Sequence, residues 1–303
     1  MIRLGLCCLF AEQPIKFSTT TATHLLKMPR DEQLQKLSRL CLANAQALWR
    51  AYEFCAGAGI GCFRINSQIL PLKTHPQAGY QVEELPDGKK IIAALRACGD
   101  LLRQRSLRAS FHPDQFVVLN SPNPQTVANS ISEIEYQAEV AQWVGVDVIN
   151  IHAGGGYGDK ESALERFVQG VSRLSPAARE RLTVENDDRT YTPSELLPVC
   201  RQLKLPLVYD VHHHRCLPDE LDIKDVTDAA ISTWNREPLF HLSSPIGGWQ
   251  GKHPNRHHDY IDFTDFPDYW LNLTAGITIE VEAKAKELAV LRLKGDLATK
   301  ISS

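Results

Sequence analysis

Short apolar segments alternate with longer segments of helical periodicity along the whole chain. The short segments are rich in branched and aromatic residues, which predicts buried strands, and they cover residues 2–9, 60–65, 107–112, 146–152, 182–186, 206–210, 239–243 and 277–283. The segments between them place apolar residues at helical spacing, over residues 31–56, 88–105, 124–145, 160–174, 192–204, 222–235, 264–273 and 284–297. The pattern therefore predicts eight strand–helix units.

This alternation of strands and helices determines the expected fold class. Strands separated by helices pair in parallel, and eight such units in 303 residues predict an α/β protein with a single (β/α)8 TIM barrel over residues 1–303. A doubly wound open sheet is the alternative, but no GxGxxG motif follows the first strand. No apolar run approaches the about 20 residues that cross a membrane, so we expect no membrane partner.

Composition is typical of a globular protein, with 43% hydrophobic and 23% charged residues. The eight cysteines lie mostly in apolar segments without a CxxC pair, so we expect free thiols in a reducing, cytoplasmic compartment. The start, MIRLGLCCLF, has an apolar stretch shorter than that of a usual signal peptide, and we interpret it as the first strand. The net charge of −3 gives no overall basic field, so a polyanionic partner must be bound by a local patch.

Histidines and carboxylates collect at the carboxyl ends of the predicted strands or in the loops that follow them. In a TIM barrel all these ends open onto one face, where active sites are built. Imidazole nitrogens and carboxylate oxygens are ligands of Mn²⁺, Zn²⁺ and Fe²⁺. A single histidine at a strand end is ordinarily a structural residue, but so many together predict a multinuclear metal site, with the candidates His75, His112, His152, Glu185, Asp210, His213, His241, His257 and Glu282.

The chemistry of such a site points to phosphodiester hydrolysis. Two divalent ions about 3.5–4 Å apart stabilise an in-line displacement at phosphorus. No Ser-His-Asp or Cys-His arrangement competes with it in the sequence. Two features stay open: GGGYG (154–158) could bind a phosphate through backbone N–H groups or could be a permissive turn, and only some of the residues in HHH (212–214) can face a metal together with Asp210.

Several long motifs occur in order along the chain, among them FHPDQFVVLNSP (111–122), INIHAGGGYGDK (149–160), YDVHHH (209–214) and VEAKAKE (281–287). With these motifs the chain resembles the UV damage endonucleases. These are metal-dependent DNA repair enzymes whose TIM barrel is related to that of AP endonucleases of the endonuclease-four type. The resemblance runs over nearly the whole chain.

The resemblance implies a role for each matching residue. It implies that His112, His152, Glu185, Asp210, His213, His241, His257 and Glu282 are metal ligands, that Glu185, His112, His152 and Glu282 act in catalysis, and that His75 is a further active-site histidine. The expected cofactor is two or three Mn²⁺ ions, with Zn²⁺ or Mg²⁺ as alternatives. The expected reaction is a nick immediately 5′ of a cyclobutane pyrimidine dimer or 6-4 photoproduct, with 3′-hydroxyl and 5′-phosphate ends.

The same resemblance implies how the DNA is bound. The expected partner is double-stranded DNA with UV lesions, with no obligate protein partner. Gln115 and Phe116 match a pair that enters the duplex opposite the lesion, where a ring can stack and an amide can pair with an orphaned base. In the loop 249–260, Lys252 and Arg256 are candidates for phosphate contacts, with Trp249 available for stacking; the alternative is a solvated lid without contact to the substrate.

Two positions depart from the family pattern. Leu239 stands where relatives often have a lysine that can be carboxylated to assist the metals, and Leu6 stands where a tyrosine that probes DNA can occur. Leucine can do neither, so metal number, metal affinity or pH optimum are expected to differ. Two other function classes remain: a sugar isomerase or epimerase of the xylose-isomerase-like barrel type, and a non-catalytic damage-binding relative.

Overall fold

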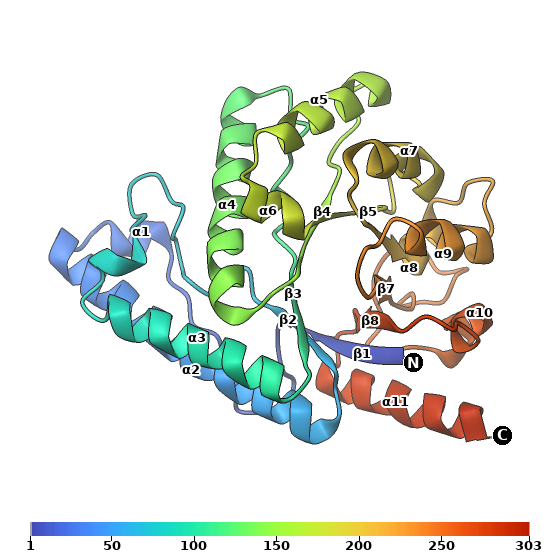
Figure 1. The fold of residues 1–303 in the computed structure, drawn as a ribbon, viewed down its shortest axis with the longest axis horizontal. Helices are drawn as coiled ribbons and strands as arrows, with labels where there is room; N and C mark the ends of the chain where they lie inside the picture. The colour runs from blue at the N-terminus through green and yellow to red at the C-terminus, as the bar shows by residue number, and fades with distance from the viewer. Residues whose placement is uncertain (1, 303) are drawn as a thin grey trace.

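The computed structural model describes residues 2–302, and its eight strands form a closed barrel in which sequence neighbours are spatial neighbours. Every strand pairs in parallel with the next, and β1 closes the barrel against β8. Figure 1 shows the strands at the centre and the helices outside them. The strands are β1 (Ile2–Cys7), β2 (Cys62–Ile65), β3 (Arg108–Phe111), β4 (Val148–His152), β5 (Leu182–Glu185), β6 (Leu207–Asp210), β7 (Leu239–Leu242) and β8 (Ile277–Val281).

Helices connect consecutive strands and cover the outside of the barrel. Helices α2 and α3 pack against each other, and α11 packs beside β1 at the closure of the sheet. Among the described helices, none combines the length and the apolar character needed to cross a bilayer. The helices are α1 (Ala22–Leu25), α2 (Arg30–Ala58), α3 (Gly88–Gln104), α4 (Pro124–Val144), α5 (Lys160–Ser172), α6 (Pro176–Arg181), α7 (Pro193–Leu203), α8 (Val211–Cys216), α9 (Ile223–Ile231), α10 (Asp268–Leu271) and α11 (Glu287–Ser302), with 3-10 turns at Val82–Glu84 and Phe263–Asp265.

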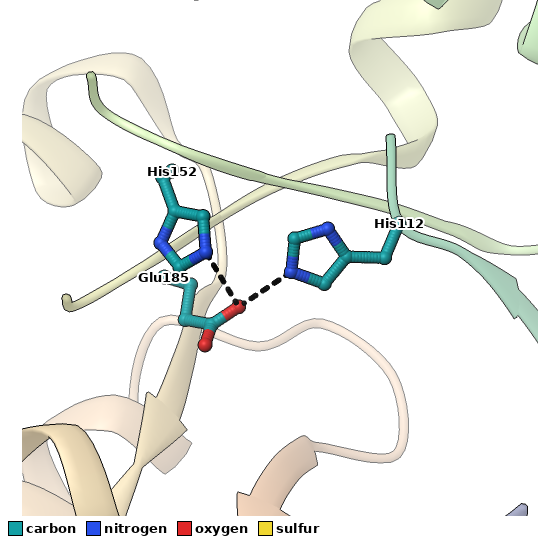
Figure 2. Close-up of side chains that lie close together, drawn as sticks. All are labelled: His112, His152 and Glu185. Carbon is teal, nitrogen blue, oxygen red and sulfur yellow. Dashed lines mark hydrogen bonds and ion pairs between the residues drawn. The ribbon is translucent and has the colours of Figure 1, made fainter. Parts of the chain in front are cut away.

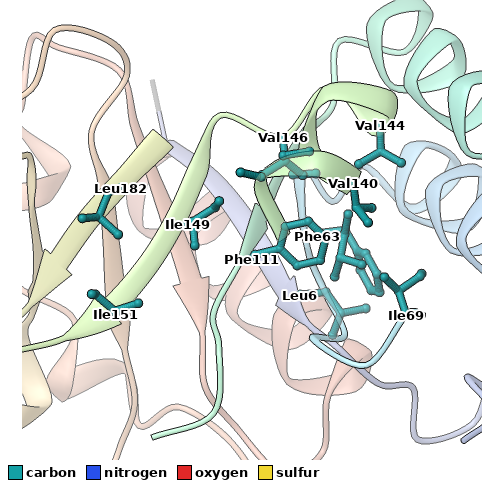
Figure 3. Packing of buried hydrophobic residues seen from close by; sticks show 14 of the residues in the cluster. Leu6, Phe63, Ile69, Phe111, Val140, Val144, Val146, Ile149, Ile151 and Leu182 are labelled. Atoms are coloured by element: carbon teal, nitrogen blue, oxygen red, sulfur yellow. The ribbon is translucent and has the colours of Figure 1, made fainter. Parts of the chain in front are cut away.

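The two-residue alternation of each strand sorts its side chains between an apolar outside and a more polar inside. Outward residues such as Phe63, Phe111 and Ile149 are fully buried against the helices, where Val140 and Val144 of α4 meet them (Figure 3). Burial of each such side chain stabilises the fold by about 1.5–3 kcal/mol. This shell between strands and helices is the main hydrophobic core.

The inside of the barrel is layered along its axis. A small apolar layer of Val148, Val208 and Leu239 lies in the middle, separate from the main core. Charged side chains lie on both sides of it, toward the amino ends and toward the carboxyl ends of the strands. Gly5 of β1 is needed for this packing, because a Cβ there would lie 3.1 Å from Cγ of Glu280.

The predicted TIM barrel is confirmed, with differences at particular elements. The first strand ends at Cys7 rather than residue 9, because Cys8 takes a left-handed conformation with φ of 61°. The helix expected over 222–235 ends at Ile231. The helix expected over 264–273 is divided into a 3-10 turn and α10, since Pro267 between them cannot donate the backbone bond that would join them.

Candidate metal centre

Glu185 occupies the centre of a cluster at the carboxyl end of the barrel. It is the last residue of β5 and is 1% exposed. Its Oε2 lies 3.0 Å from Nε2 of His112 and 4.0 Å from Nε2 of His152, as Figure 2 shows. Its Oε1 lies 3.2 Å from Nδ1 of His213 and 3.1 Å from Nδ1 of His241. One carboxylate therefore faces four imidazoles from four different strand ends or loops.

Three groups of side chains have the spacing that a cation requires, and they are linked in a row. Neighbouring groups share Glu185 or Asp210, and the three groups together would hold up to three divalent ions. Within each group the candidate ligand atoms all lie within 4.8 Å of one another. The groups are His112, His152 and Glu185; then Glu185, Asp210 and His213; then Asp210, His241 and Glu282.

Local structure after β6 explains the position of the middle group. Asp210 caps the one-turn helix α8, and its Oδ1 accepts the backbone N–H of His213 at 2.8 Å. The cap turns the next residues into a helix, which the sequence pattern did not predict. His213 therefore returns toward Asp210, with Nδ1 3.5 Å from Oδ2. His212 points away and contacts the carbonyl of Ser243, as expected for a histidine outside the metal site.

Burial and charge shift the protonation of this cluster in opposite directions. Burial lowers the pKa of His241, but the Glu185 carboxylate raises it more, to about 10. Burial also lowers the pKa of His213, and Asp210 and Glu185 raise it well above its usual value. Burial raises the pKa of Glu185, but the charges of His241 and His152 hold it well below the usual range. The carboxylates therefore favour protons on His213 and His241, whereas burial lowers the pKa of His152.

Three buried side-chain atoms of the ligand groups have no hydrogen-bond partner within the described chain. They are Nδ1 of His152, Oδ2 of Asp210 and Nδ1 of His241. Asp210 and His241 are fully buried, and their two atoms lie 3.9 Å apart without hydrogen-bond geometry. A buried acceptor without a partner costs about 1–3 kcal/mol, and a cation between these atoms would satisfy both. The residues present therefore fit a bound divalent metal.

Sequence reasoning missed two charged residues beside the cluster, Arg64 and Glu280. Nε of Arg64 donates to Oε2 of Glu280 at 2.6 Å, and its Nη1 donates to Oε1 of Glu282 at 2.6 Å. Glu280 also accepts from Ser110 and is 1% exposed. A signal was present, because Thr278, Glu280 and Glu282 alternate along β8 as inward residues do. Asn150, which donates to Glu185, was also missed.

The structure does not bring every predicted ligand into the three groups. His257 lies at the edge, with Nδ1 3.6 Å from Oε2 of Glu282. His75 belongs to none of the groups; its Nδ1 accepts the backbone N–H groups of Gln77 and Ala78, so that nitrogen caps its own loop. A strand-end loop defines only the face of the barrel, and the turn within the loop decides where the side chain points.

The two departures from the family pattern are both buried. Leu6 is fully buried among the outward residues (Figure 3), so it faces the helices rather than the metal centre. Leu239 lies in the apolar layer with Val148 and Val208, two residues before His241 on the same side of β7. Its effect on metal binding stays a prediction.

Two cavities flank the metal centre. One, which we call the aromatic groove, has a volume of about 780 Å³ and is lined by the ligands His152 and His213 together with Gln115, Phe116 and Tyr157. Phe116 is 76% exposed and Tyr157 is 49% exposed. The loop that carries Phe116 turns sharply because its backbone N–H donates to the Asp114 carboxylate.

The second cavity, the basic groove, lies on the side of Glu282 and His257 and has a volume of about 670 Å³. Its lining includes Arg64, Arg256, Lys284 and Lys286. Lys252 is exposed nearby in sequence but does not line this cavity. Trp249 is half-buried, its Nε1 donates to Asp265 and the Arg215 guanidinium lies 5.5 Å from the centre of its ring, so stacking of Trp249 on DNA stays a prediction.

Two named relatives and one crystal structure are similar to nearly the whole chain. The chain is 35% identical over 302 residues to a Bacillus velezensis protein named UV DNA damage endonuclease, covering 96% of this chain and 91% of that protein. A Bacillus mycoides protein of the same name is also 35% identical, covering 93% and 89%. The crystal structure of SacUVDE matches with a TM-score of 0.87 and 26% identity over 99% of both chains.

More distant structures share the fold alone. Endonuclease IV from Thermus thermophilus has a TM-score of 0.62 and 18% identity, covering 98% of this chain and 99% of that one. A D-psicose 3-epimerase from Clostridium cellulolyticum has a TM-score of 0.54 and 14% identity, covering 98% of this chain and 97% of that one. The sequence model of UV-endonuclease UvdE matches residues 2–302. The chain therefore belongs to the UV-endonuclease UvdE family.

Proposed function

We propose that this protein is a metal-dependent DNA repair endonuclease. It nicks double-stranded DNA immediately 5′ of cyclobutane pyrimidine dimers and 6-4 photoproducts and leaves 3′-hydroxyl and 5′-phosphate ends. The observation that carries the proposal is the row of three ligand groups, two of whose histidines, His152 and His213, line a groove with exposed aromatic side chains. The names of the relatives from Bacillus support the same activity.

Two or three divalent ions, Mn²⁺ in the first place and Zn²⁺ or Mg²⁺ as alternatives, would stabilise the charge that develops at phosphorus and supply a nucleophilic water at neutral pH. The residues that would hold them are those of the three groups, with His257 at the edge. Glu185 and Asp210 each belong to two groups, so the loss of either carboxylate would disturb two groups at once. A thiol nucleophile is not favoured, because burial raises the pKa of Cys8 to about 11.

The aromatic groove supports recognition of a distorted duplex. Phe116 stands out from its loop, and Gln115 beside it carries an amide donor and an acceptor. An inserted aromatic ring replaces stacking that the lesion has already weakened. Tyr157 lines the same cavity, so an extruded base would meet a second ring beside the ligands His152 and His213. Selectivity then follows from the low cost of opening damaged DNA.

The basic groove supports contact with the sugar–phosphate backbone. Arg256 and Lys284 are exposed there and lie beside the Glu282 end of the metal row. Cations next to bound phosphate give affinity that falls with salt. We propose Arg256, and more peripherally Lys252, as phosphate contacts. We further propose that residues 1–303 act as one domain, in the cytoplasm and without an obligate protein partner.

The decisive experiment is nicking of supercoiled plasmid, with and without UV irradiation, in Mn²⁺ and in EDTA. We expect nicking only of the irradiated plasmid and only with metal. Equal nicking of both plasmids would indicate a nonspecific nuclease. Binding of irradiated DNA without incision under any metal would indicate a non-catalytic damage-binding relative. A shifted ketose–aldose equilibrium without nicking would indicate a sugar isomerase or epimerase.

Phe116→Ala tests the lesion-reading part separately. Loss of one stacking ring should weaken binding of irradiated DNA by about 1–3 kcal/mol, or roughly 5- to 150-fold. Mn²⁺ affinity should stay unchanged, because Phe116 belongs to none of the ligand groups. Leu9→Ala is a matched control, since Leu9 is also an exposed large apolar residue but lines neither groove. Equal losses in both variants would contradict the role of Phe116.

A further inference from the structure

Glu280 is a buried carboxylate that the metal row does not use. It lies in the middle of β8, belongs to none of the ligand groups and is 1% exposed. Its Oε2 lies 3.2 Å from Nε2 of His241, on the opposite side of the imidazole from the metal row. Ser110 donates to its other oxygen, and Arg64 holds Oε2 at 2.6 Å. Ser110 and Arg64 thus orient this carboxylate toward His241.

The other nitrogen of the same ring faces the candidate metal ligands. Nδ1 of His241 lies 3.1 Å from Oε1 of Glu185, 3.5 Å from Oε1 of Glu282 and 3.9 Å from Oδ2 of Asp210. It is buried without a hydrogen-bond partner. To bind a cation, Nδ1 must offer its lone pair, and a neutral ring then carries its proton on Nε2. That N–H needs an acceptor in a fully buried place.

Two side chains compete for Nε2 of His241, and they favour opposite tautomers. Nη2 of Arg64 lies 2.8 Å from Nε2 and can only donate, which favours a ring with its proton on Nδ1. Ionised Glu280 can only accept, which favours the proton on Nε2. Among the described residues, Glu280 supplies the one carboxylate within hydrogen-bond distance of Nε2.

We infer that Glu280 is the positioning residue of His241: it accepts the Nε2 proton and so holds Nδ1 as the atom that faces the metal. Arg64 keeps this carboxylate in place and, through Glu282, joins it to the third ligand group. A carboxylate behind a metal-binding histidine fixes its tautomer and raises its basicity. The inference rests on the metal-dependent part of the proposed function.

Glu280→Gln tests the inference with almost no change of shape. The amide can donate to Nε2 and so favours the tautomer that cannot bind metal, as an asparagine does behind the histidine of serine proteases. We expect Mn²⁺ affinity to fall by about 10- to 100-fold for the ion held by His241. The measurement is a titration of the DNA-free protein with Mn²⁺, with free Mn²⁺ followed by electron paramagnetic resonance.

The matched control is Glu237→Gln, which removes a carboxylate paired with Arg3 and Thr278 at the other end of the barrel. This variant should keep wild-type Mn²⁺ affinity within about twofold. Nitrogen-15 spectra of histidine-labelled protein loaded with Zn²⁺ give a second readout. They should show a protonated Nε2 on His241 in the wild type and a shifted signal in Glu280→Gln.

Unchanged Mn²⁺ affinity and unchanged His241 signals in Glu280→Gln would overturn the inference. If that variant does not fold, Ser110→Ala removes only one bond to the carboxylate and should lower Mn²⁺ affinity by a smaller factor; wild-type affinity there would equally overturn it. Because no DNA is present, the outcome is independent of nicking. A protein that shows the Glu280 effect but cuts no irradiated plasmid would refute the proposed function alone.

Discussion

The two ends of the barrel interior are both charged, yet only the carboxyl ends of the strands carry side chains arranged as a metal site. At the amino ends, Arg108 pairs with Asp147 at 2.9 Å and donates to Thr278. Arg3 pairs with Glu237 there as well. At the carboxyl ends, carboxylates face histidines, and Asp210 and His241 keep buried atoms without partners.

The difference lies in how the charged groups are paired. At the amino ends Asp147 and Glu237 face guanidinium groups, and the buried atoms that the described chain leaves without a partner there, Nε and Nη2 of Arg236, are donors that would repel a cation. At the carboxyl ends the carboxylates lie among imidazoles, and both kinds of group can bind divalent cations. Charge inside a barrel is therefore weak evidence of function, whereas unsatisfied charge at the face where loops gather is strong evidence.

The largest expected effect comes from removing the shared ligand at the carboxyl ends. Glu185→Gln should lower nicking of irradiated plasmid by at least about 100-fold, because one carboxylate serves two ligand groups. Binding of irradiated DNA should change little, since both grooves remain. Gel-shift and nicking assays on one preparation separate the two effects. Weakened binding with normal turnover of the bound complex would refute the ligand role.

A variant at the amino ends should lose stability but keep its Mn²⁺ affinity. Arg108→Met removes a buried guanidinium that pairs with Asp147, donates to Thr278 and contacts the Trp234 ring. We expect a loss of about 2 kcal/mol in the free energy of unfolding, roughly 30-fold in the folding equilibrium. Urea denaturation measures this loss. Mn²⁺ affinity should stay at the wild-type level, and a large drop would mean that the two ends are coupled.

The pH dependence of metal binding should reflect the raised histidine pKa values. A cation must displace protons from His241, whose pKa is raised to about 10, and from His213. Mn²⁺ affinity should therefore rise with pH, by up to about tenfold per pH unit for each proton released. Titrations at pH 6.5, 7.5 and 8.5 test this rise, and a flat profile would contradict the assigned protonation.

The same shift has a consequence for the metal-free protein. A folded-state pKa above the unfolded value of about 6.5 means that His241 holds its proton more tightly when folded. Its contribution to stability is complete below about pH 6.5 and is lost as the pH rises toward about 10. Unfolding in EDTA should become easier over this range, while protein with Mn²⁺ should change less.

The smallest effect is expected from a volume-conserving change in the apolar layer that separates the two ends. Leu239→Met conserves volume and polarity, so it should cost less than about 1.5 kcal/mol and leave Mn²⁺ binding unchanged. Leu239→Ala, which opens a cavity beside Val148 and Val208, should cost about 2–5 kcal/mol. Changed Mn²⁺ binding in the methionine variant would show that this layer also tunes the metal centre.

The order of strands and helices, the closed barrel and the face that carries the chemistry were predictable from the sequence alone. The two-residue period of strands and the longer period of helices are local properties of a chain. Eight parallel strands joined by helical crossovers are typical of a closed barrel. His112, His152 and Glu185 come together because His152 and Glu185 end their strands and His112 directly follows β3.

Only the tertiary structure decided which charged residues pair with one another. Arg64 and Glu280 are 216 positions apart, and nothing in either local sequence indicates that the two side chains pair. His75 follows its strand like a ligand, yet its own turn uses its Nδ1. Distances between side chains depend on barrel closure and loop turns, which no local pattern contains. The chemistry at the barrel mouth could thus be predicted from residue types, but its hydrogen-bond partners could not.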